Sequence, residues 1–442
     1  MLDDILEKVR QAGIVGAGGA GFPTSVKLKA SPEYIIVNGA ECEPLLQVDQ
    51  QLSAVFAPLL LKTLNDLVAA IGAKGGIFAL KEKYKKAAAA LREEVGAYPA
   101  LSLKYLGNYY PMGDEQVLVY EVLGRIVPEG GLPLASGAVV VNVETLLNIA
   151  YALADGRPVT EKYVTITGAV KKPVTLKVPV GLKYSDLIAA AGGATVKNPA
   201  IINGGPMMGK AEADLEQPVT KTSKGLIVLN ADHPWIRAKR RSLQEMMRIA
   251  KTACCHCMLC TDLCPRYMLG HRLHPDKIMR LASYNSTCEK EEAAAGAFLC
   301  CECGLCEIAC IMSLQPWKLN QELKKRLGAL GVKNPRHEKP AAANPFRPYR
   351  QYPIPKLIQR LGLAAYDHID APLADYAGEA REARLLLKQH LGAPCVPDVA
   401  VGDEVRKGQA IASPAPGALG ACLHSSLDGR VKHIDNFSIV VA

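Results

Sequence analysis

Residues 254–265 read CCHCMLCTDLCP, and residues 300–310 read CCECGLCEIAC. Each run contains the spacing C-x₂-C-x₂-C-x₃-C, which is typical of bacterial ferredoxins that hold [4Fe–4S] clusters. In that pattern the first three cysteines of a run bind one cluster, and the fourth cysteine binds the other cluster. The two runs therefore predict two clusters whose fourth ligands are exchanged between the runs.

The predicted ligands form two sets of four. We assign cluster 1 to Cys254, Cys257, Cys260 and Cys310, and cluster 2 to Cys300, Cys303, Cys306 and Cys264. A zinc site or disulfides are the alternatives, but zinc usually takes two separated C-x₂-C pairs and needs only four ligands. Cys255 and Cys301 adjoin ligands and offer another register, although a shift by one residue breaks the spacing in both runs.

Length and charge restrict the class of protein. The chain has 442 residues, of which 49% are hydrophobic, so we expect about three globular domains with buried cores. The net charge of +9 comes from scattered Lys and Arg residues. We therefore expect no nucleic-acid binding, and an acidic protein partner or a phosphate-bearing ligand instead.

Two observations bear on the compartment. No stretch approaches the roughly 20 apolar residues that span a bilayer, and residues 1–5 lack the order of a signal peptide. Cysteines in cluster spacing suit a reducing environment. We predict a cytoplasmic protein without a transmembrane segment, associated at most with a microcompartment or the inner membrane face.

The first part of the chain alternates helices and strands. We expect helices over 2–12, 52–72, 83–95 and 115–124, and strands over 34–37, 75–80 and 138–141, which form one α/β domain. The glycine tract at 16–21 matches G-x-G-x-x-G, but a helix precedes it and Pro23 follows it, so we reject a Rossmann site. The tract still lets backbone N–H groups approach a phosphate.

Polar residues follow two of the predicted strands. Asn38, Glu41 and Glu43 come after strand 34–37, and the motif NVET at 142–145 comes after strand 138–141. In α/β folds ligands bind at the carboxyl ends of strands. These polar residues therefore mark a candidate ligand site.

Four motifs in order carry a resemblance to a known family. They are GAGGAGFPT at 16–24, ECEP at 41–44, GDE at 113–115 and NVET at 142–145. They resemble the NADH-binding flavoprotein subunit of respiratory complex I, and more closely the RnfC component of the Rnf complex and its short soluble relatives. Those relatives include the cobalamin reductase of propanediol microcompartments and the NADH-oxidising subunit of some methylenetetrahydrofolate reductases. The resemblance covers nearly the whole chain.

The resemblance implies bound FMN, with NADH as the electron donor. The glycine loop and Lys27 would hold FMN phosphate and NADH, and further residues would line the flavin and the nicotinamide. The implied cofactor-binding residues are Gly16, Gly18, Gly19, Ala20, Gly21, Phe22, Lys27, Asn38, Glu41, Glu43, Tyr110, Gly113, Asp114, Glu115, Asn142 and Thr145. Complex I has an Asp where this chain has Ala40, which removes one flavin hydrogen bond. No catalytic side chain is implied, because hydride passes directly from nicotinamide to flavin.

The resemblance also predicts a multidomain fold of the α/β and α+β classes. The expected parts are an FMN/NADH domain (1–158), a β-grasp, SLBB-like domain (159–235), a helical two-cluster ferredoxin-like module (236–332), a Pro/Arg-rich linker (333–378) and a barrel-sandwich, biotinyl/lipoyl-like domain (379–442). We expect one helix over 236–252 and another around 379–391. The segment 422–426 lacks the lysine of a swinging carrier arm, so the last domain is predicted to have a structural or docking role.

These features together predict an NADH-dependent oxidoreductase. Electrons from NADH would pass through FMN and two [4Fe–4S] clusters to a partner protein in a hetero-oligomeric complex or to an acceptor. Cobalamin and the partner subunits of a methylenetetrahydrofolate reductase are the acceptors that the resemblance implies. The alternatives are a peripheral RnfC component of a membrane ferredoxin:NAD oxidoreductase and a non-catalytic iron–sulfur adaptor.

Overall fold

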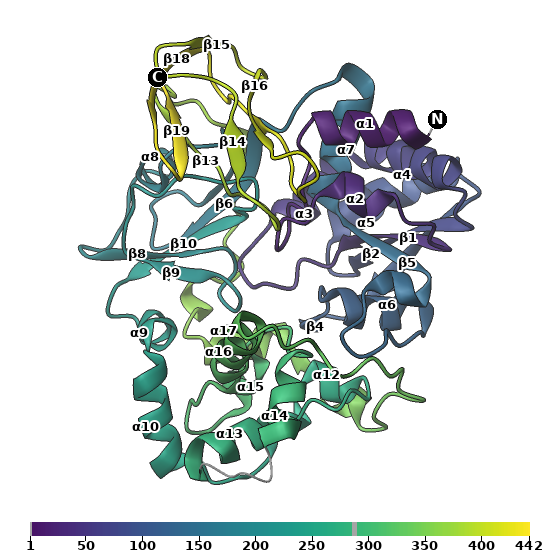
Figure 1. Cartoon of the computed structure of the whole chain (residues 1–442), viewed down its shortest axis with the longest axis vertical. Coiled ribbons are helices and arrows are strands. Elements are labelled where there is room, and N and C mark those ends of the chain that lie inside the picture. Colours follow the sequence, from purple (N-terminus) through teal and green to yellow (C-terminus); the bar gives the residue numbers. More distant parts are fainter. Residues whose placement is uncertain (1, 285–289) are drawn as a thin grey trace.

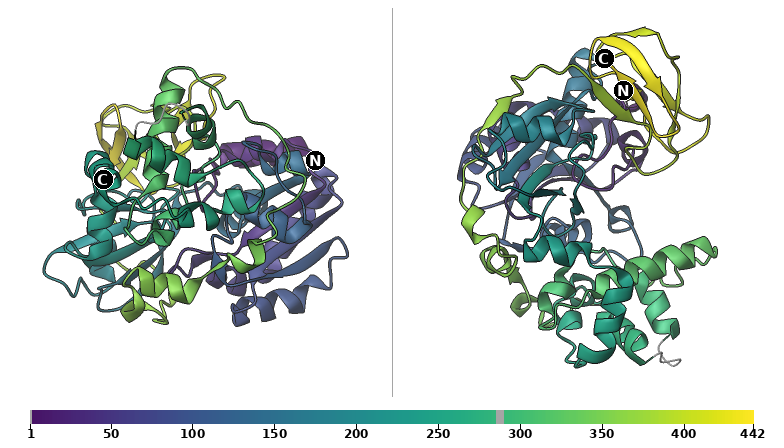
Figure 2. Two further views of the ribbon diagram at one scale, coloured as in Figure 1. Left: turned by 90° about the horizontal axis from the view of Figure 1, so that it is seen from below. Right: turned by 90° about the vertical axis from the view of Figure 1, so that its left-hand side faces the viewer.

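The computed structural model describes residues 2–284 and 290–442. Figure 1 shows the purple and blue N-terminal α/β region on the right and a teal β-region on the left. A green helical module lies at the bottom, and a yellow β-domain made by the C-terminal part lies at the top. The side view in Figure 2 also places the helical module and the yellow domain at opposite ends of the molecule.

The N-terminal sheet has four parallel strands in the order β3-β2-β1-β5. They are β1 (Tyr34–Gly39), β2 (Gly75–Lys81), β3 (Leu101–Leu106) and β5 (Ala138–Asn142). Ile35 and Val37 pack into one hydrophobic cluster and Ile36 into another, as expected for strands buried on both faces. The chain leaves β1 toward β2 and later returns to the other side of β1 as β5, so a crevice forms at the carboxyl ends of these strands.

Seven α-helices, the 3-10 helix η1 (Pro133–Ser136) and one short strand complete the described part of this region. They are α1 (Leu2–Gln11), α2 (Thr24–Leu28), α3 (Val48–Val55), α4 (Ala57–Ile71), α5 (Lys85–Val95), α6 (Glu115–Leu123), α7 (Val143–Asp155) and β4 (Tyr109–Tyr110). The predicted helix over 52–72 is thus two helices, α3 and α4, which meet at Phe56. Strand β3 is absent from the sequence prediction, since only its first and last residues are buried.

The second region is a mixed six-stranded sheet in the order β12-β7-β6-β10-β8-β9. Its elements are β6 (Glu161–Gly168), β7 (Val174–Pro179), α8 (Tyr184–Ala190), β8 (Pro199–Asn203), β9 (Lys210–Glu212), β10 (Gly225–Asn230) and β12 (Leu373–Asp375). Strand β12 comes from much later in the chain and pairs in parallel with β7. This sheet therefore takes its edge strand from the predicted linker.

The cysteine runs lie in the helical module. Its helices are α9 (Pro234–Arg240), α10 (Leu243–Ala253), α11 (Leu259–Asp262), α12 (Pro265–Met268), α13 (Pro275–Tyr284), α14 (Lys290–Ala297), α15 (Leu305–Ala309) and α16 (Pro316–Ala329). The single helix predicted over 236–252 is wrong, because the helical conformation is interrupted between the end of α9 and the start of α10. Ser242 Oγ accepts a hydrogen bond from Glu245 N (3.1 Å), which caps α10.

The predicted linker is partly structured and returns to the N-terminal region. It contains β11 (Tyr352–Pro353), which pairs antiparallel with β4, and α17 (Ile354–Arg360). The last domain has two sheets, in the orders β13-β19-β18-β15 and β14-β16-β17. Its strands are β13 (Ala383–Leu386), β14 (Cys395–Pro397), β15 (Glu404–Val405), β16 (Ala410–Pro414), β17 (Leu423–His424), β18 (Gly429–Ile434) and β19 (Ser438–Val441).

The helix predicted around 379–391 is wrong, because part of this segment forms strand β13. Ala383, Leu385 and Leu387 are buried, and this period of two fits a strand that pairs with β19. Within the described ranges no single helix is long and apolar enough to cross a membrane. Helices α3 and α4 pass that test only as a pair, which is bent by 90°.

Candidate functional site

The predicted flavin residues Asn38 and Asn142 are register partners at the carboxyl ends of β1 and β5. Asn38 Nδ2 donates to the Gly113 carbonyl (2.9 Å), and Asn142 Oδ1 accepts from Glu144 N (3.0 Å) and so caps α7. The ends of β1 and β5, the GDE turn and the N-terminus of α7 therefore lie together at the crevice. Such an end presents free backbone N–H groups to an anion.

The glycine loop is fixed at its ends and exposed in the middle. Gly16 N donates to the Phe22 carbonyl (3.0 Å), and Ala17 N donates to Thr145 Oγ1 (2.9 Å). Residues 18–20 between them are exposed. The loop is therefore anchored to the start of α7 and leaves backbone groups free for a ligand.

Lys27 and Glu115 lie against each other in the same region. Lys27 Nζ forms an ion pair with Glu115 Oε1 (2.7 Å) and donates to the Val140 carbonyl of β5 (2.8 Å). Both side chains are partly exposed. A phosphate that enters here would meet a lysine already held over the strand ends.

The Glu43 carboxylate is held by the β-grasp region. Its carboxylate accepts from the backbone N–H groups of Met207 (2.8 Å) and Met208 (2.9 Å), in the GGPMMG loop at 204–209. Burial raises the pKa of Glu43 despite these bonds. Its contacts join the flavin region to the β-grasp sheet, and this loop packs against a neighbouring domain.

Tyr110 and Asp114 point toward the helical module. The Tyr110 hydroxyl donates to the Cys303 carbonyl (2.7 Å), and Asp114 binds the Arg266 guanidinium through two hydrogen bonds (2.5 and 2.8 Å). Burial opposes the charge of Asp114, but Arg266 outweighs it and the pKa of Asp114 is lowered. These two predicted site residues therefore connect the flavin region to the cysteine runs.

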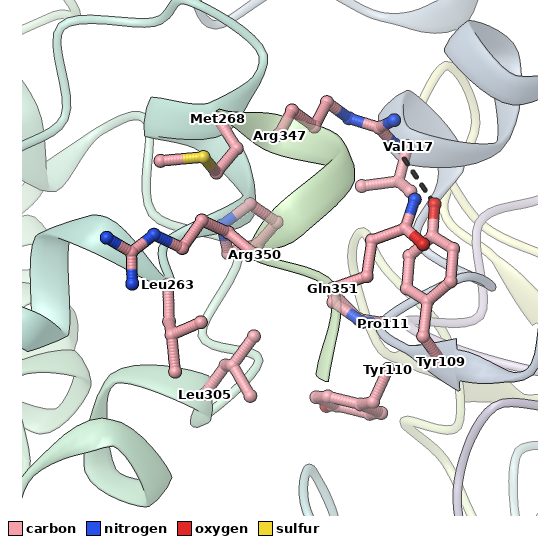
Figure 3. Close-up of a pocket in the computed structure, with 11 residues that line it drawn as sticks. Tyr109, Tyr110, Pro111, Val117, Leu263, Met268, Leu305, Arg347, Arg350 and Gln351 are labelled. Atoms are coloured by element: carbon pink, nitrogen blue, oxygen red, sulfur yellow. Dashed lines mark hydrogen bonds between the residues drawn. The ribbon is translucent and has the colours of Figure 1, made fainter. Parts of the chain in front are cut away.

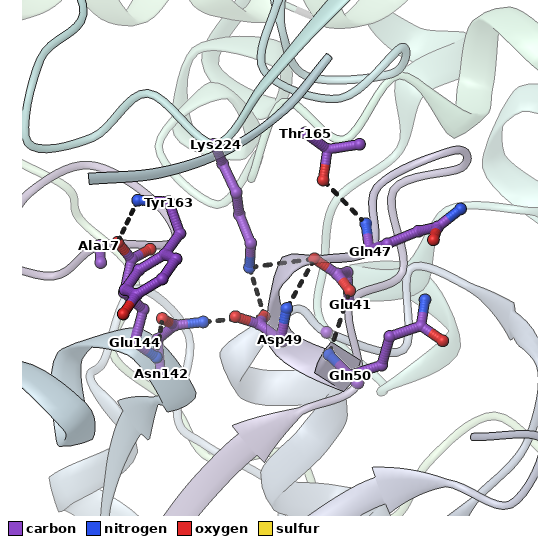
Figure 4. A network of polar contacts seen from close by, with 12 residues as sticks. Ala17, Glu41, Gln47, Asp49, Gln50, Asn142, Glu144, Tyr163, Thr165 and Lys224 are labelled. Atoms are coloured by element: carbon purple, nitrogen blue, oxygen red, sulfur yellow. Dashed lines mark hydrogen bonds and ion pairs between the residues drawn. The ribbon is translucent and has the colours of Figure 1, made fainter. Parts of the chain in front are cut away.

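A buried polar network lies beside the crevice (Figure 4) and joins the predicted residues Glu41 and Asn142 to Asp49 and Lys224, which the sequence prediction missed. Lys224, just before β10, forms ion pairs with Asp49 and with Glu41 (3.7 Å). Asn142 Nδ2 donates to Asp49 Oδ2 (3.0 Å), and Glu41 accepts from Asp49 N (3.1 Å). Burial and the neighbouring Asp49 raise the pKa of Glu41 to about 7, because Lys224 pairs mainly with Asp49.

A second buried ion pair joins the same two regions. Lys162 of β6 pairs with Glu144 of α7, and both side chains are about 1% exposed. Tyr163 N also donates to Glu144 (3.1 Å), and Lys162 Nζ reaches the Ala17 carbonyl (3.4 Å). Sequence periodicity and spacing do not show which charged residues are buried. The sequence therefore did not predict this ion pair, although the NVET motif contains Glu144.

The crevice fits a flavin nucleotide on its own chemistry. Asp49 Oδ1 is buried and has no hydrogen-bond partner among the described residues. A buried acceptor in that state calls for a donor, which the N–H of a flavin ring or a ribityl hydroxyl supplies. The open glycine loop, Lys27 and the α7 N-terminus supply the groups that hold a phosphate.

The two cysteine runs share one backbone conformation. His256 (φ 53°) and Met258 (φ 62°) of the first run correspond to Glu302 (φ 60°) and Gly304 (φ 78°) of the second. Left-handed backbone is uncommon outside glycine, so its repetition at the same two offsets shows that both loops are shaped alike. The short helices α11 and α15, which follow the loops, pack against each other.

The first predicted ligand set surrounds one cavity. Its lining includes Cys254, Cys257, Cys260 and Cys310, with Cys255 beside them. Among the described residues no three Cys, His, Asp or Glu side chains converge on a single metal position. Ligands spaced around a volume rather than a point fit a cubane cluster better than zinc.

The second predicted set is buried more deeply. Cys264, Cys303 and Cys306 are 6–8% exposed, whereas Cys255 and Cys257 of the first run are exposed. Cys301 lies among the second set and hydrogen-bonds to Cys303. The assignment of individual ligands in both sets stays a prediction.

A small cavity lies where the helical module meets the flavin region (Figure 3). It is lined by Tyr109, Tyr110, Pro111, Val117, Leu263, Pro265, Met268, Leu305, Arg347, Arg350 and Gln351. Arg347 donates to the Tyr109 hydroxyl (3.0 Å) and pairs with Glu121 (2.6 Å). Segment 347–351, which belongs to the predicted linker, thus covers the side of this junction that lies next to Cys264 and Pro265.

Comparison with known families identifies each part of the chain. Residues 9–151 match the Nuo51 FMN-binding domain, 163–211 the SLBB domain, 253–315 the 4Fe-4S dicluster domain and 371–442 the RnfC barrel sandwich hybrid domain. These matches confirm the predicted fold class, and FMN and two [4Fe–4S] clusters as the cofactors.

Full-length relatives give the same result. The chain is 44% identical to the cobalamin reductase PduS of Citrobacter freundii over 99% of this chain and 96% of that protein, and 43% identical to PduS of Salmonella typhimurium with the same coverage. It is 34% identical to the RnfC-type component of the Na⁺-translocating ferredoxin:NAD⁺ oxidoreductase complex of Acetobacterium woodii, over 60% of this chain and 58% of that one.

A solved structure shares the fold. The crystal structure of the NAD⁺-reducing [NiFe]-hydrogenase in the H₂-reduced state matches 73% of this chain and 61% of the other chain, with 22% identity and a TM-score of 0.50. The chain belongs to the RnfC-like family of NADH-linked flavin and iron–sulfur oxidoreductases, in the short form that includes PduS.

Proposed function

We propose that this chain passes electrons from NADH to a corrinoid of the cobalamin class, and that the predicted residues hold the cofactors. Bound FMN would supply hydride acceptance from NADH and release of single electrons, and the two [4Fe–4S] clusters would supply one-electron transfer. The protein contributes binding, orientation and exclusion of water. Glu41, Asn142 and Lys27 would hold the flavin, and the glycine loop would hold phosphate.

The contact between the second cysteine run and the flavin region carries this proposal. Tyr110 reaches the Cys303 carbonyl (2.7 Å), and Asp114 binds Arg266, two residues after Cys264. Cys303 of the second run and Arg266, after Cys264 of the first run, are therefore fixed by buried bonds against Tyr110 and the GDE turn. Such rigid contacts keep the distance between two redox groups constant.

The first run supplies the exit side. Apolar side chains that line its cavity are exposed: Met258 by 38%, Ile311 by 65% and Met312 by 45%. Exposed apolar residues around a cofactor cavity mark a contact surface. We place the acceptor, or the protein that presents it, on this surface.

Full-length similarity to the two PduS proteins supports a corrinoid acceptor, because their name states that they reduce cobalamin. The RnfC-type component of the ion-translocating complexes matches only part of the chain, so a role in such a complex is the second candidate. Specific partner proteins and a cytoplasmic or microcompartment location remain predictions.

Anaerobic spectroscopy tests the proposal. The purified chain should contain one FMN and about eight irons, and NADH should bleach the flavin and cluster absorbance before cob(III)alamin is reduced. Met312→Lys, on the proposed exit surface, should slow corrinoid reduction and leave bleaching by NADH intact. Val396→Lys, an exposed apolar position in the last domain, is the matched control. If NADH bleaches the flavin and cluster absorbance of the wild type but cob(III)alamin is not reduced, the corrinoid acceptor is wrong and the NADH-to-cluster route stands.

A further inference from the structure

The last domain packs on the outer side of the glycine loop. Leu391 N donates to the Gly21 carbonyl (3.1 Å), at the end of the loop. A Cβ atom on Gly21 would lie 3.1 Å from the Gln389 carbonyl oxygen and 2.9 Å from Thr222 Cγ2. Gly21 also has φ +71°, so this position requires glycine both for its backbone conformation and for the close packing of segment 389–391.

The start of the loop meets the same domain at Gly13. Its φ is +64°, and a Cβ atom there would lie 2.2 Å from the Cys422 carbonyl oxygen. A real side chain would force the two domains apart. The last domain therefore contacts both ends of segment 13–21, while residues 18–20 stay exposed.

Lys221 connects the three domains at this junction. Its ammonium donates to the carbonyls of Gly13 (2.8 Å) and Cys422 (2.7 Å), and its backbone N donates to Gln389 Oε1 (2.8 Å). The side chain is 3% exposed, and burial lowers the pKa of Lys221 to about 8. Hydrogen bonds from a buried cation are stronger than neutral ones, so removing this lysine leaves two buried carbonyls without their donor.

We propose that the last domain braces the phosphate loop of the flavin domain, with Lys221 as the positioning residue that joins them. The inference rests on the proposed flavin site. The contacts at Gly13 and Gly21 hold the ends of the loop, so the free N–H groups between them are already arranged when the nucleotide arrives. Docking of the last domain and binding of FMN then stabilise each other, because linkage between two binding equilibria is reciprocal.

Titration of FMN into the flavin-depleted, full-length protein tests the brace, with quenching of flavin fluorescence as the readout. If Lys221→Met leaves the glycine loop in its FMN-binding conformation in only about a tenth of the molecules, the Kd for FMN rises about tenfold. Gln389→Ala removes the bond to the Lys221 backbone and the bond from Gln389 Nε2 to the Leu386 carbonyl (3.1 Å), and should raise the Kd by a smaller factor. Lys388→Met, an exposed neighbour in the same segment, is the control and should leave the Kd unchanged.

Hydrogen exchange of the wild type gives a readout that needs no variant. FMN should slow exchange in segments 389–391 and 420–424, both outside the crevice. An unchanged Kd in Lys221→Met and Gln389→Ala, or unchanged exchange in these segments, would overturn the brace while the flavin site stands. A wild type that binds no FMN would overturn the flavin site as well.

Discussion

The paired side chains of Asp114 and Arg266 allow the junction between flavin region and cysteine runs to be weakened selectively. Both are largely buried, at 14% and 8% side-chain exposure. Removing one partner of a buried pair leaves an uncompensated charge, which costs about 3–5 kcal/mol. In Arg266→Met, Asp114 keeps two backbone donors at the start of α6, Gln116 N and Val117 N (3.1 Å each). We therefore expect the local stability of the junction to fall by about 3 kcal/mol, the low end of that range.

Local hydrogen exchange is the suitable assay, since a multidomain protein with cofactors does not unfold in one step. Amides of α6 and α12 should exchange on the order of 100-fold faster in Arg266→Met. The double variant Asp114→Asn/Arg266→Met removes both charges, so its loss should fall about 2 kcal/mol short of the sum of the single losses. Arg326→Met, which breaks an exposed pair with Glu322, should cost under about 1 kcal/mol and serves as the control.

The pH dependence follows from the lowered pKa of Asp114. A carboxyl with a lowered pKa in the folded state stabilises the protein above its unfolded pKa, near 4, and loses that contribution as the pH falls further. The effect of Arg266→Met should therefore be constant between about pH 6 and 8. The coupled buried pair would be refuted if the stability losses of the two single variants add up in the double variant, or if Arg266→Met lies within about 0.5 kcal/mol of the wild type in local stability.

Three further outcomes are expected. Because the pKa of Glu41 is raised to about 7, folding stability should fall as the pH rises from about 4.3 to 7, and Glu41→Gln should flatten the thermal midpoint measured across that range. Tyr110→Phe leaves the buried Cys303 carbonyl without its donor and should cost about 1–3 kcal/mol in local exchange. Cys310→Ala should lower iron from about eight to about four per chain, whereas Cys255→Ala should keep about eight.

The cysteine spacing and the polar residues after two strands were predictable from the sequence because they depend on local patterns. The two C-x₂-C-x₂-C-x₃-C runs fold into matching loops, and Asn38 and Asn142 lie at the ends of β1 and β5, whose adjacency only the structure shows. Buried charges were not predictable. Lys224 and Asp49 occur in stretches that read as ordinary surface, and only the packing of two domains shows that they face each other.

The errors in secondary structure have separate physical causes. Segment 379–391 is rich in Ala, Glu, Arg and Leu, which favour helix, but pairing of β13 with β19 overrides that local preference. The break before α10 does have a local signal, because Ser242 and Glu245 have the spacing of a capping box. The resemblance implies that Glu43 lines the nicotinamide site, and this role stays a prediction; in the structure its carboxylate contacts the GGPMMG loop.

The pairing of β11 with β4 has a consequence for biosynthesis. The ribosome makes β4 long before β11, and the sheet of β7 likewise waits for β12. The first half of the chain therefore cannot reach its final fold until residues 352–375 have been made, and contacts between such distant segments form slowly. We expect chains that end before residue 352 to leave β4 and the outer edge of β7 without their partner strands, which would expose unpaired strand edges to other chains.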